Sequence, residues 1–140
     1  MKTSIPAIST CAPRACTGFS LVDDLKPDAL VRMKAQGFEP AAVVETSLSN
    51  LQAWLKHGAT LDEASSTRAA KLLVERFGGD PGSADWRHFG RLAGFTNPKP
   101  NRRLASGLQP FAGCLKPAAR STGRRRSLSQ RFGRQWSVRR

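Results

Sequence analysis

The residues best suited to chemistry lie in one short run, Arg-Leu-Ala-Gly-Phe-Thr-Asn-Pro-Lys-Pro-Asn-Arg-Arg, at positions 91–103. Its side chains that can bind phosphate or hydrogen-bond a nucleotide are Arg91, Asn97, Lys99, Arg102 and Arg103. Arginine binds phosphate through two parallel hydrogen bonds, whereas lysine acts as a point charge. Because glycine and proline interrupt the run, we predict a loop that contacts nucleotide or nucleic acid.

Charge is distributed unevenly along the 140 residues. Residues 1–85 carry nine Lys and Arg against ten Asp and Glu, whereas residues 86–140 carry fourteen Lys and Arg and no acidic residue, which together give the net charge of +13. A neutral half joined to a basic half favours a polyanionic partner, with nucleic acid as the leading candidate. If about six of these cations met phosphates, log affinity would fall with log salt at a slope of roughly −5.

Three aspartates that precede the loop are candidate partners for it. Asp23 and Asp24 follow the apolar run 19–22, and Asp80 lies eleven residues before Arg91. Aspartate is common in turns because its side chain hydrogen-bonds nearby backbone. From residue type alone, an ordinary acidic turn is therefore the simpler interpretation of all three positions.

The elements that must position these residues begin after an unpatterned start. Residues 1–18 lack helical or strand periodicity, and we expect them to be disordered. Residues 19–22 are predicted to form a strand, and residues 27–36 a helix with Pro27 in its first turn and Gly37 as a left-handed stop. Residues 41–46 contain two adjacent valines and suit a buried strand. Together these segments predict a β-α-β unit.

The middle of the chain is less clear. Residues 50–57 fit a helix and a strand equally well, because their apolar positions match both periods. Thr60 and Glu63 form a capping-box pattern that predicts the start of a long helix, although Ser65-Ser66-Thr67 leaves open a break. The apolar face of this helix is Leu61, Ala69, Leu72, Leu73 and Phe77, and Gly78-Gly79 ends it.

The last part of the chain is predicted to be mostly irregular. Residues 108–115 form a weak strand candidate, and residues 116–140 are basic with few apolar groups, so we expect a disordered tail. Three cysteines, Cys11, Cys16 and Cys114, cannot complete a tetrahedral metal site, and we expect free thiols in the cytoplasm. No run is long and apolar enough to predict a membrane span or a secretion signal.

Aromatic and histidine positions allow more than one interpretation. Trp54 is expected in the core, whereas Trp86 and Phe95 lie close enough to the basic loop to stack bases. His57 and His88 have no carboxylate or cysteine at ligand spacing along the sequence, so we expect both on the surface.

Several short motifs occur together in this chain: Val22-Asp23-Asp24-Leu25, Val44-Glu45-Thr46-Ser47 with Asn50, Gln52, Ala53 and Trp54, Gly79-Asp80, and Arg91-Leu92-Ala93-Gly94-Phe95-Thr96-Asn97 with Lys99. Their types and order resemble the RepB-like DNA primase domain of plasmid replication and mobilization proteins, a branch of the archaeo-eukaryotic primase superfamily. The resemblance covers about residues 19–112. Because only 18 residues precede the first strand, we expect a truncated member of this family.

The resemblance implies an α+β fold with a partial RRM-like primase core at residues 19–115. It also implies synthesis of short primers from nucleoside triphosphates on single-stranded DNA with Mg²⁺ or Mn²⁺, with a replication helicase or relaxase as candidate partners. By matching position, Asp23, Asp24 and Asp80 would be the catalytic, metal-binding carboxylates, with Asp85 as the fallback for Asp80. The implied nucleotide or nucleic-acid contacts are Gln52, Arg91, Asn97, Lys99, Arg102 and Arg103.

Two other functions remain open from the sequence. The chain could be a noncatalytic basic module that binds single-stranded DNA or RNA through the loop and the tail. It could also be a remnant without function. Nucleotidyl transfer requires carboxylates that hold divalent ions beside cations that hold a triphosphate, so the primase hypothesis requires the three aspartates to meet the basic loop in space.

Overall fold

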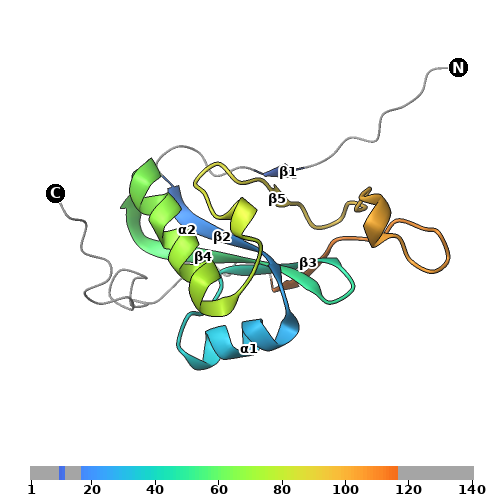
Figure 1. Cartoon of the computed structure of the whole chain (residues 1–140), viewed down its shortest axis with the longest axis horizontal. Coiled ribbons are helices and arrows are strands. Elements are labelled where there is room, and N and C mark those ends of the chain that lie inside the picture. Colours follow the sequence, from blue (N-terminus) through green and yellow to red (C-terminus); the bar gives the residue numbers. More distant parts are fainter. Residues whose placement is uncertain (1–9, 12–16, 117–140) are drawn as a thin grey trace, which may run out of the picture.

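The computed structural model describes residues 10–11 and 17–116 (Figure 1). Within these residues, four strands form an antiparallel sheet in the order β2-β4-β3-β6, and β1 pairs with β5 apart from it. The strands are β1 Thr10–Cys11, β2 Thr17–Leu25, β3 Ala42–Ser47, β4 Asn50–Leu61, β5 Gly90–Arg91 and β6 Gly113–Lys116. The helices are α1 Pro27–Ala35 and α2 Glu63–Phe77, with short 3-10 turns at η1 Pro81–Ser83 and η2 Pro100–Arg102.

The predicted β-α-β unit is confirmed, with one strand inserted into it. Strands β2 and β3 both run antiparallel to β4, which lies between them, so they are parallel to each other and α1 connects them. This split β-α-β arrangement is the α+β architecture that the family resemblance implied. Helix α1 ends one residue before its predicted end, and Gly37 adopts the expected left-handed conformation with φ of 80°.

The hydrophobic core lies between one face of the sheet and both helices. Side chains alternate along a strand, so the core face of β4 carries Leu51, Ala53 and Leu55, all buried. The helices contribute Met33 from α1 and Phe77 from α2. The intervening positions on the strands point to the other face, which is where polar side chains can lie without disturbing the core.

Residues 50–57, which fitted a helix and a strand equally well, form the first part of strand β4. This strand extends to Leu61 because β4 pairs along its length with β2. The predicted capping box is wrong, since Thr60 and Leu61 lie in this strand. The helix begins at Glu63 instead, and the Asp62 carboxylate caps it by accepting the Ser65 N–H at 2.7 Å, which lowers the pKa of Asp62. Helix α2 continues through Ser65–Thr67 without a break, because Ser66 is buried against the fold.

Other predictions need correction near the sheet. The last strand is shorter and later than the predicted 108–115, because before β6 only an isolated bridge between Thr96 and Phe111 forms. Trp54 is only partly buried and lies on the face opposite the helices, since strand alternation separates it from Leu55. A Cβ on Gly90 would lie 2.2 Å from the Trp54 ring, so this indole packs directly under β5.

The terminal segments are only partly described. Of residues 1–18, predicted to be disordered, residues 10–11 and 17–18 are described and lie in strands β1 and β2. Residues 117–140 lie outside the described residues, as does Cys16. Cys114 is an exposed free thiol. Among the described residues, neither helix is long and apolar enough to cross a bilayer.

His57 is buried, which contradicts its predicted surface position. Strand β4 runs further than residue 57, so alternation puts this imidazole on the core side with Leu55, where its Nε2 lies 2.9 Å from the Ser20 hydroxyl. Burial disfavours the charged imidazolium and lowers the pKa of His57 to about 4.

The stability of the fold should therefore depend on the protonation of His57. Its folded pKa lies below the usual 6.5, so the unfolded chain binds the proton more readily, and stability should fall as the pH drops from about 6.5 towards 4. The loss can reach about 3 kcal/mol. Urea unfolding of the wild type and of His57→Gln at several pH values measures the difference. Equal pH dependence in the two proteins would contradict a buried neutral histidine.

Candidate active site

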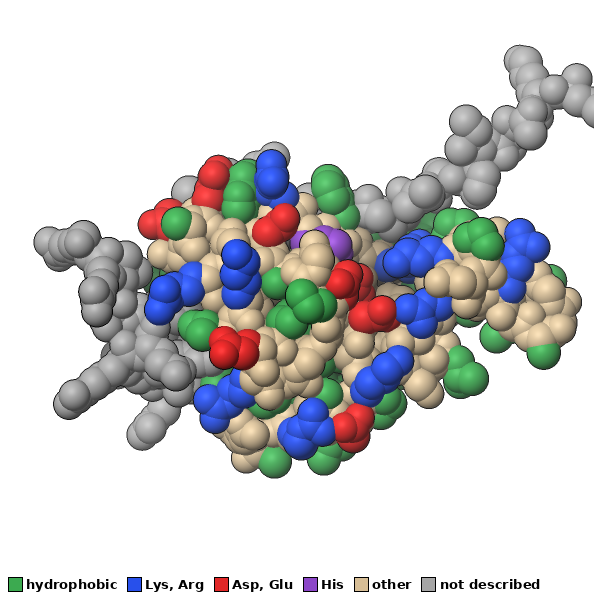
Figure 2. Space-filling view, viewed as in Figure 1, with side chains coloured by type: hydrophobic (Ala, Val, Ile, Leu, Met, Phe, Trp, Pro, Cys, Tyr) green, Lys and Arg blue, Asp and Glu red, His purple; other side chains and the backbone are tan. Residues whose placement is uncertain are grey.

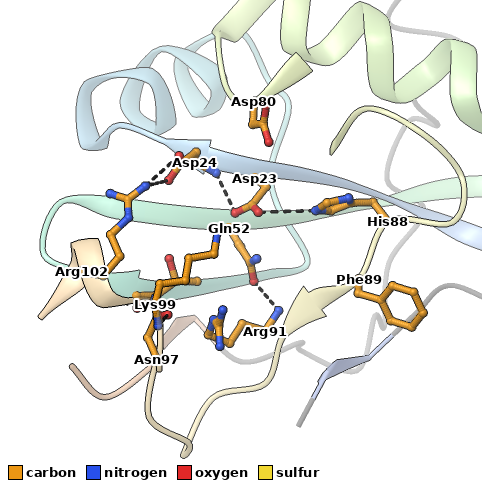
Figure 3. A pocket seen from close by; sticks show the side chains of 11 residues that line it. Asp23, Asp24, Gln52, Asp80, His88, Phe89, Arg91, Asn97, Lys99 and Arg102 are labelled. Carbon is orange, nitrogen blue, oxygen red and sulfur yellow. Dashed lines mark hydrogen bonds and ion pairs between the residues drawn. The ribbon is translucent and has the colours of Figure 1, made fainter. Parts of the chain in front are cut away.

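One pocket collects nearly all the residues predicted to bind or react. It is lined by both members of the predicted acidic pair, the later aspartate, and most of the predicted contacts: Asp23, Asp24, Asp80, Gln52, Arg91, Asn97, Lys99 and Arg102 (Figure 3). The predicted residue Arg103 and the fallback Asp85 are not among the lining residues. The pocket also includes three residues that were not predicted as site residues: Thr46, which lies in one of the family motifs, His88 and Phe89.

Asp23, Asp24 and Asp80 form one wall of the pocket, here called the acidic wall, which begins at the end of β2. Val22 is fully buried on the core side, so the next residue, Asp23, points to the open face of the sheet. The Asp23 side chain is only 18% exposed. Its Oδ1 accepts the Asp24 N–H at 2.7 Å, and its Oδ2 lies 3.5 Å from Nε2 of His88. These two contacts fix the orientation of the Asp23 carboxylate, and its oxygens still have lone pairs that could coordinate a metal ion.

Asp80 is brought to this wall by a backbone contact that only glycine permits. The Asp80 N–H donates to the Asp23 carbonyl at 3.0 Å. Gly79, immediately before it, has φ of 126°, and a Cβ there would lie 2.7 Å from the same Asp23 carbonyl oxygen. The Asp80 Oδ1 accepts the Gly82 N–H at 2.9 Å, which caps η1. Two aspartates that are far apart in sequence are thus adjacent in the fold, through a backbone hydrogen bond.

The second member of the acidic pair is already engaged. Asp24 has a left-handed backbone, with φ of 55°, which turns its side chain away from that of Asp23. Nη2 of Arg102 donates to both carboxylate oxygens of Asp24, at 3.0 and 2.9 Å. This ion pair joins the basic loop to the end of β2, and it leaves Asp24 less available as a metal ligand than Asp23.

Arg91, Lys99 and Arg102 form the other wall of the pocket, here called the basic wall. Buried side-chain amides hold its backbone on the open face of the sheet. Gln52, which is 3% exposed, accepts the Arg91 N–H at 2.8 Å. Asn97, which is 2% exposed, donates to the Thr46 carbonyl at 2.9 Å and accepts the Lys99 N–H at 3.2 Å. Asn97 therefore holds the loop, whereas the sequence had suggested a direct contact with a sugar or base.

His88 was predicted to be an isolated surface residue; its side chain is partly exposed, at 28%, but it is not isolated. Its imidazole faces the Asp23 carboxylate and lines the pocket (Figure 3). Sequence spacing could not show this pairing, because the two residues come from segments that meet only in the fold. The available signal was the position of His88 three residues before Arg91, which had already been assigned to the site.

Opposite charges face each other across the pocket. Figure 2 shows acidic side chains beside a histidine and, next to them, basic side chains of the projecting part of the chain. Among residues 10–11 and 17–116, no three carboxylate, imidazole or thiol groups are close enough to hold a metal ion by themselves. Asp23 and Asp80 nevertheless fit Mg²⁺ or Mn²⁺, which bind hard oxygen ligands and often take only one or two carboxylates beside water and substrate phosphates.

Solved structures similar to this chain include those of a primase, RepB′. The crystal structure of primase RepB′ shares 44% sequence identity with a TM-score of 0.65, covering 72% of this chain and 34% of that one. The catalytic domain of primase RepB′ in complex with initiator DNA shares 42% identity with a TM-score of 0.64, covering 72% and 50%. At 16% identity and a TM-score of 0.58, the AEP domain of the Cyanophage S-2L primase-polymerase supports the fold alone, over 84% and 60%.

The chain belongs to the RepB DNA-primase N-terminal domain family, whose model matches residues 7–135. Mobilization protein A of Escherichia coli is 42% identical over 118 residues, which are 84% of this chain and 17% of that protein. A DNA primase of Acidithiobacillus ferrooxidans is 31% identical over 115 residues, 80% of this chain and 32% of that protein. The chain thus spans a third or less of these curated relatives, and the family resemblance is confirmed.

The glycine contact that brings Asp80 to Asp23 can be tested by adding a methyl group. Gly79→Ala should be destabilised by about 1–3 kcal/mol beyond its control, because the new Cβ would push the Asp80 segment away from β2. The matched control is Gly78→Ala, since Gly78 also has a positive φ, 84°, but open space where a Cβ would lie. Urea unfolding compares the two variants. Equal destabilisation would show that steric contact with Asp23 is unimportant.

Proposed function

We propose that this chain carries the nucleotidyl-transfer site of a primase that acts in the replication of plasmid or other mobile DNA. Its substrates are nucleoside triphosphates and a single-stranded DNA template. The observation that carries the proposal is the convergence of Asp23 and Asp80 opposite Arg91 and Lys99 in one pocket. The similarity of the chain to a DNA primase, a mobilization protein and primase RepB′ supports the same conclusion.

Asp23 and Asp80 are the residues that would hold Mg²⁺ or Mn²⁺. The backbones that carry the two carboxylates are joined by the hydrogen bond from the Asp80 N–H to the Asp23 carbonyl, and both side chains line the same pocket. Each carboxylate keeps oxygen lone pairs beyond those used in its hydrogen bonds to the Asp24 and Gly82 N–H groups. A bound ion would neutralise triphosphate charge and favour loss of the proton from the attacking 3′ hydroxyl. Asp24 remains a third candidate ligand, and it becomes available when Arg102 leaves it.

The basic wall would hold the triphosphate. Arg91 lies on the open face of the sheet with its backbone fixed by Gln52, and Lys99 follows the buried anchor Asn97. Both cations are thus carried on backbone that is already ordered, which limits the entropy lost on binding. Arg102 can exchange Asp24 for a phosphate at little cost, because its ion pair is partly exposed and such pairs contribute only about 0–1 kcal/mol.

Single-stranded DNA would enter from the exposed side of the pocket. Phe89 lines the pocket and is 59% exposed, and Phe95 on the loop is 45% exposed, so both offer surfaces on which bases can stack. The neighbouring cations suit the template backbone. A structure of the related RepB′ catalytic domain contains initiator DNA, which supports a DNA partner here. A cytoplasmic location and a helicase or relaxase partner belong to the same proposal.

Removing either carboxylate should abolish synthesis while sparing the template contact. We expect Asp23→Asn and Asp80→Asn each to lower metal-dependent primer synthesis by at least about 100-fold, because each removes charge that holds the metal and triphosphate. DNA binding should be kept or strengthened, since a negative charge is removed from the site. Primer synthesis on single-stranded DNA with Mg²⁺ or Mn²⁺ and DNA affinity are measured on the same samples.

The control for this experiment is Asp28→Asn, which removes an exposed carboxylate on α1 that pairs with Arg32. It should leave both synthesis and DNA binding unchanged. A wild-type chain that binds DNA but makes no primer, with both site variants indistinguishable from it, would instead support the second candidate function, a noncatalytic module for single-stranded DNA or RNA.

A further inference from the structure

A second groove, outside the candidate active site, runs along the first half of α2. It is lined by apolar and basic side chains of the helix and by one tryptophan from the segment that follows η1. The residues that matter are Thr67, Arg68, Lys71, Leu72 and Trp86. None of them lines the active-site pocket. From the sequence, Trp86 was predicted to stack bases beside the Arg91–Arg103 loop, but in the structure it lines this groove on α2 and not the active-site pocket.

Trp86 is held in place at the groove. Its backbone N–H donates to the Thr67 hydroxyl at 3.3 Å, which ties the segment to α2. The Arg87 guanidinium lies 5.8 Å from the centre of the indole ring, within the range of a cation-π contact. The side chain is only partly buried, so the indole keeps surface open to a ligand. An ordered, partly exposed aromatic beside a guanidinium is suited to stacking a base.

The groove adjoins the active-site pocket through one short piece of backbone. His88 and Phe89 line the pocket, whereas Trp86 lines the groove. Two residues of extended chain span at most about 7 Å, so Trp86 and His88 are neighbours on the scale of one or two nucleotides. The exposed residue Arg87 lies between them. A single strand of nucleic acid that leaves the pocket over Phe89 can therefore pass Arg87 and reach Trp86.

The charge of the groove favours a polyanion. Arg68 and Lys71 line it and Arg87 lies over its tryptophan, while Glu63 is the one acidic residue among those that line it. Figure 2 shows basic side chains interspersed with acidic ones over the α2 side of the molecule, and further basic side chains beside the acidic pocket. Cations alternating with an aromatic match the alternation of phosphates and unpaired bases, which a duplex does not present.

From these observations we infer that the groove formed by Thr67, Lys71, Leu72 and Trp86 is a second contact for single-stranded nucleic acid, which holds the strand after it leaves the active-site pocket. The inference rests on the proposed function, because it takes the same strand to occupy both places. In this arrangement Trp86 stacks a base, and Lys71 and Arg87 contact phosphates on either side of it.

The test compares oligothymidylates of two lengths, one of about five nucleotides that fits the pocket alone and one of about twenty that spans both places. Trp86→Ala should weaken binding of the long oligonucleotide by about 5- to 100-fold, in line with the loss of one stacked base, and leave the short one unchanged. Lys71→Gln should reduce the log-log salt slope for the long oligonucleotide by about 0.7, the contribution of one phosphate contact.

Two further variants keep the test decisive. Trp86→Phe preserves an aromatic ring and should bind the long oligonucleotide nearly as well as the wild type, provided that thermal unfolding shows the same fold. Lys34→Gln removes an exposed cation from α1 and should leave the log-log salt slope unchanged for both the short and the long oligonucleotide. Unchanged long-oligonucleotide binding in Trp86→Ala, or equal weakening at both lengths, would overturn the inference.

The outcome for the groove is separable from the outcome for the active site. Asp23→Asn should abolish synthesis yet retain the difference in affinity between long and short oligonucleotides, since its charge lies in the pocket and not in the groove. Loss of that difference in Asp23→Asn would also contradict two separate contacts.

Discussion

The site depends on the close approach of the Gly79-Asp80 segment to the end of β2. Helix α2 ends at Phe77, which is buried in the core, so the chain that follows emerges at a fixed place beside Val22 and Asp23. Because Gly79 has no side chain, the backbones come close enough for the Asp80 N–H to bond to the Asp23 carbonyl. Packing of the helix against the sheet therefore fixes the backbone of Asp80 beside that of Asp23.

The basic wall of the pocket is positioned by side-chain hydrogen bonds instead of by a close contact between backbones. Its cations are exposed or partly exposed, but the backbone that carries them is tied to the sheet by buried amide groups, Gln52 to Arg91 and Asn97 to Thr46. Buried hydrogen bonds of this kind are costly to leave unmade, which makes the loop base rigid. The contact between Asp24 and Arg102 is the exception, because it is partly exposed. The pocket therefore combines a rigid frame with one exchangeable ion pair.

Sequence reasoning was most successful where local signals and the fold agreed. Pro27 and Gly37 marked α1, and the valines at 43 and 44 marked a buried strand, because these preferences are set within a few residues. The site residues came from motif order, and the structure brings most of them into one pocket. The prediction that failed at α2 failed because Asp62 competes with Thr60 as a cap, and only strand pairing decides between them.

The features that sequence could not provide are contacts between distant segments. The burial of His57 depends on the full length of β4, the role of His88 depends on Asp23, and the engagement of Asp24 depends on a loop some eighty residues later. The most direct test of the central claim is Mn²⁺ binding in the presence of a nucleoside triphosphate, measured by electron paramagnetic resonance on the wild type, Asp23→Asn, Asp80→Asn and the double variant. If the two carboxylates share one ion, each single variant loses at least about tenfold in affinity and the double variant loses far less than the product of the two. Losses that multiply, or an Asp80→Asn variant with wild-type affinity, would contradict a shared ion.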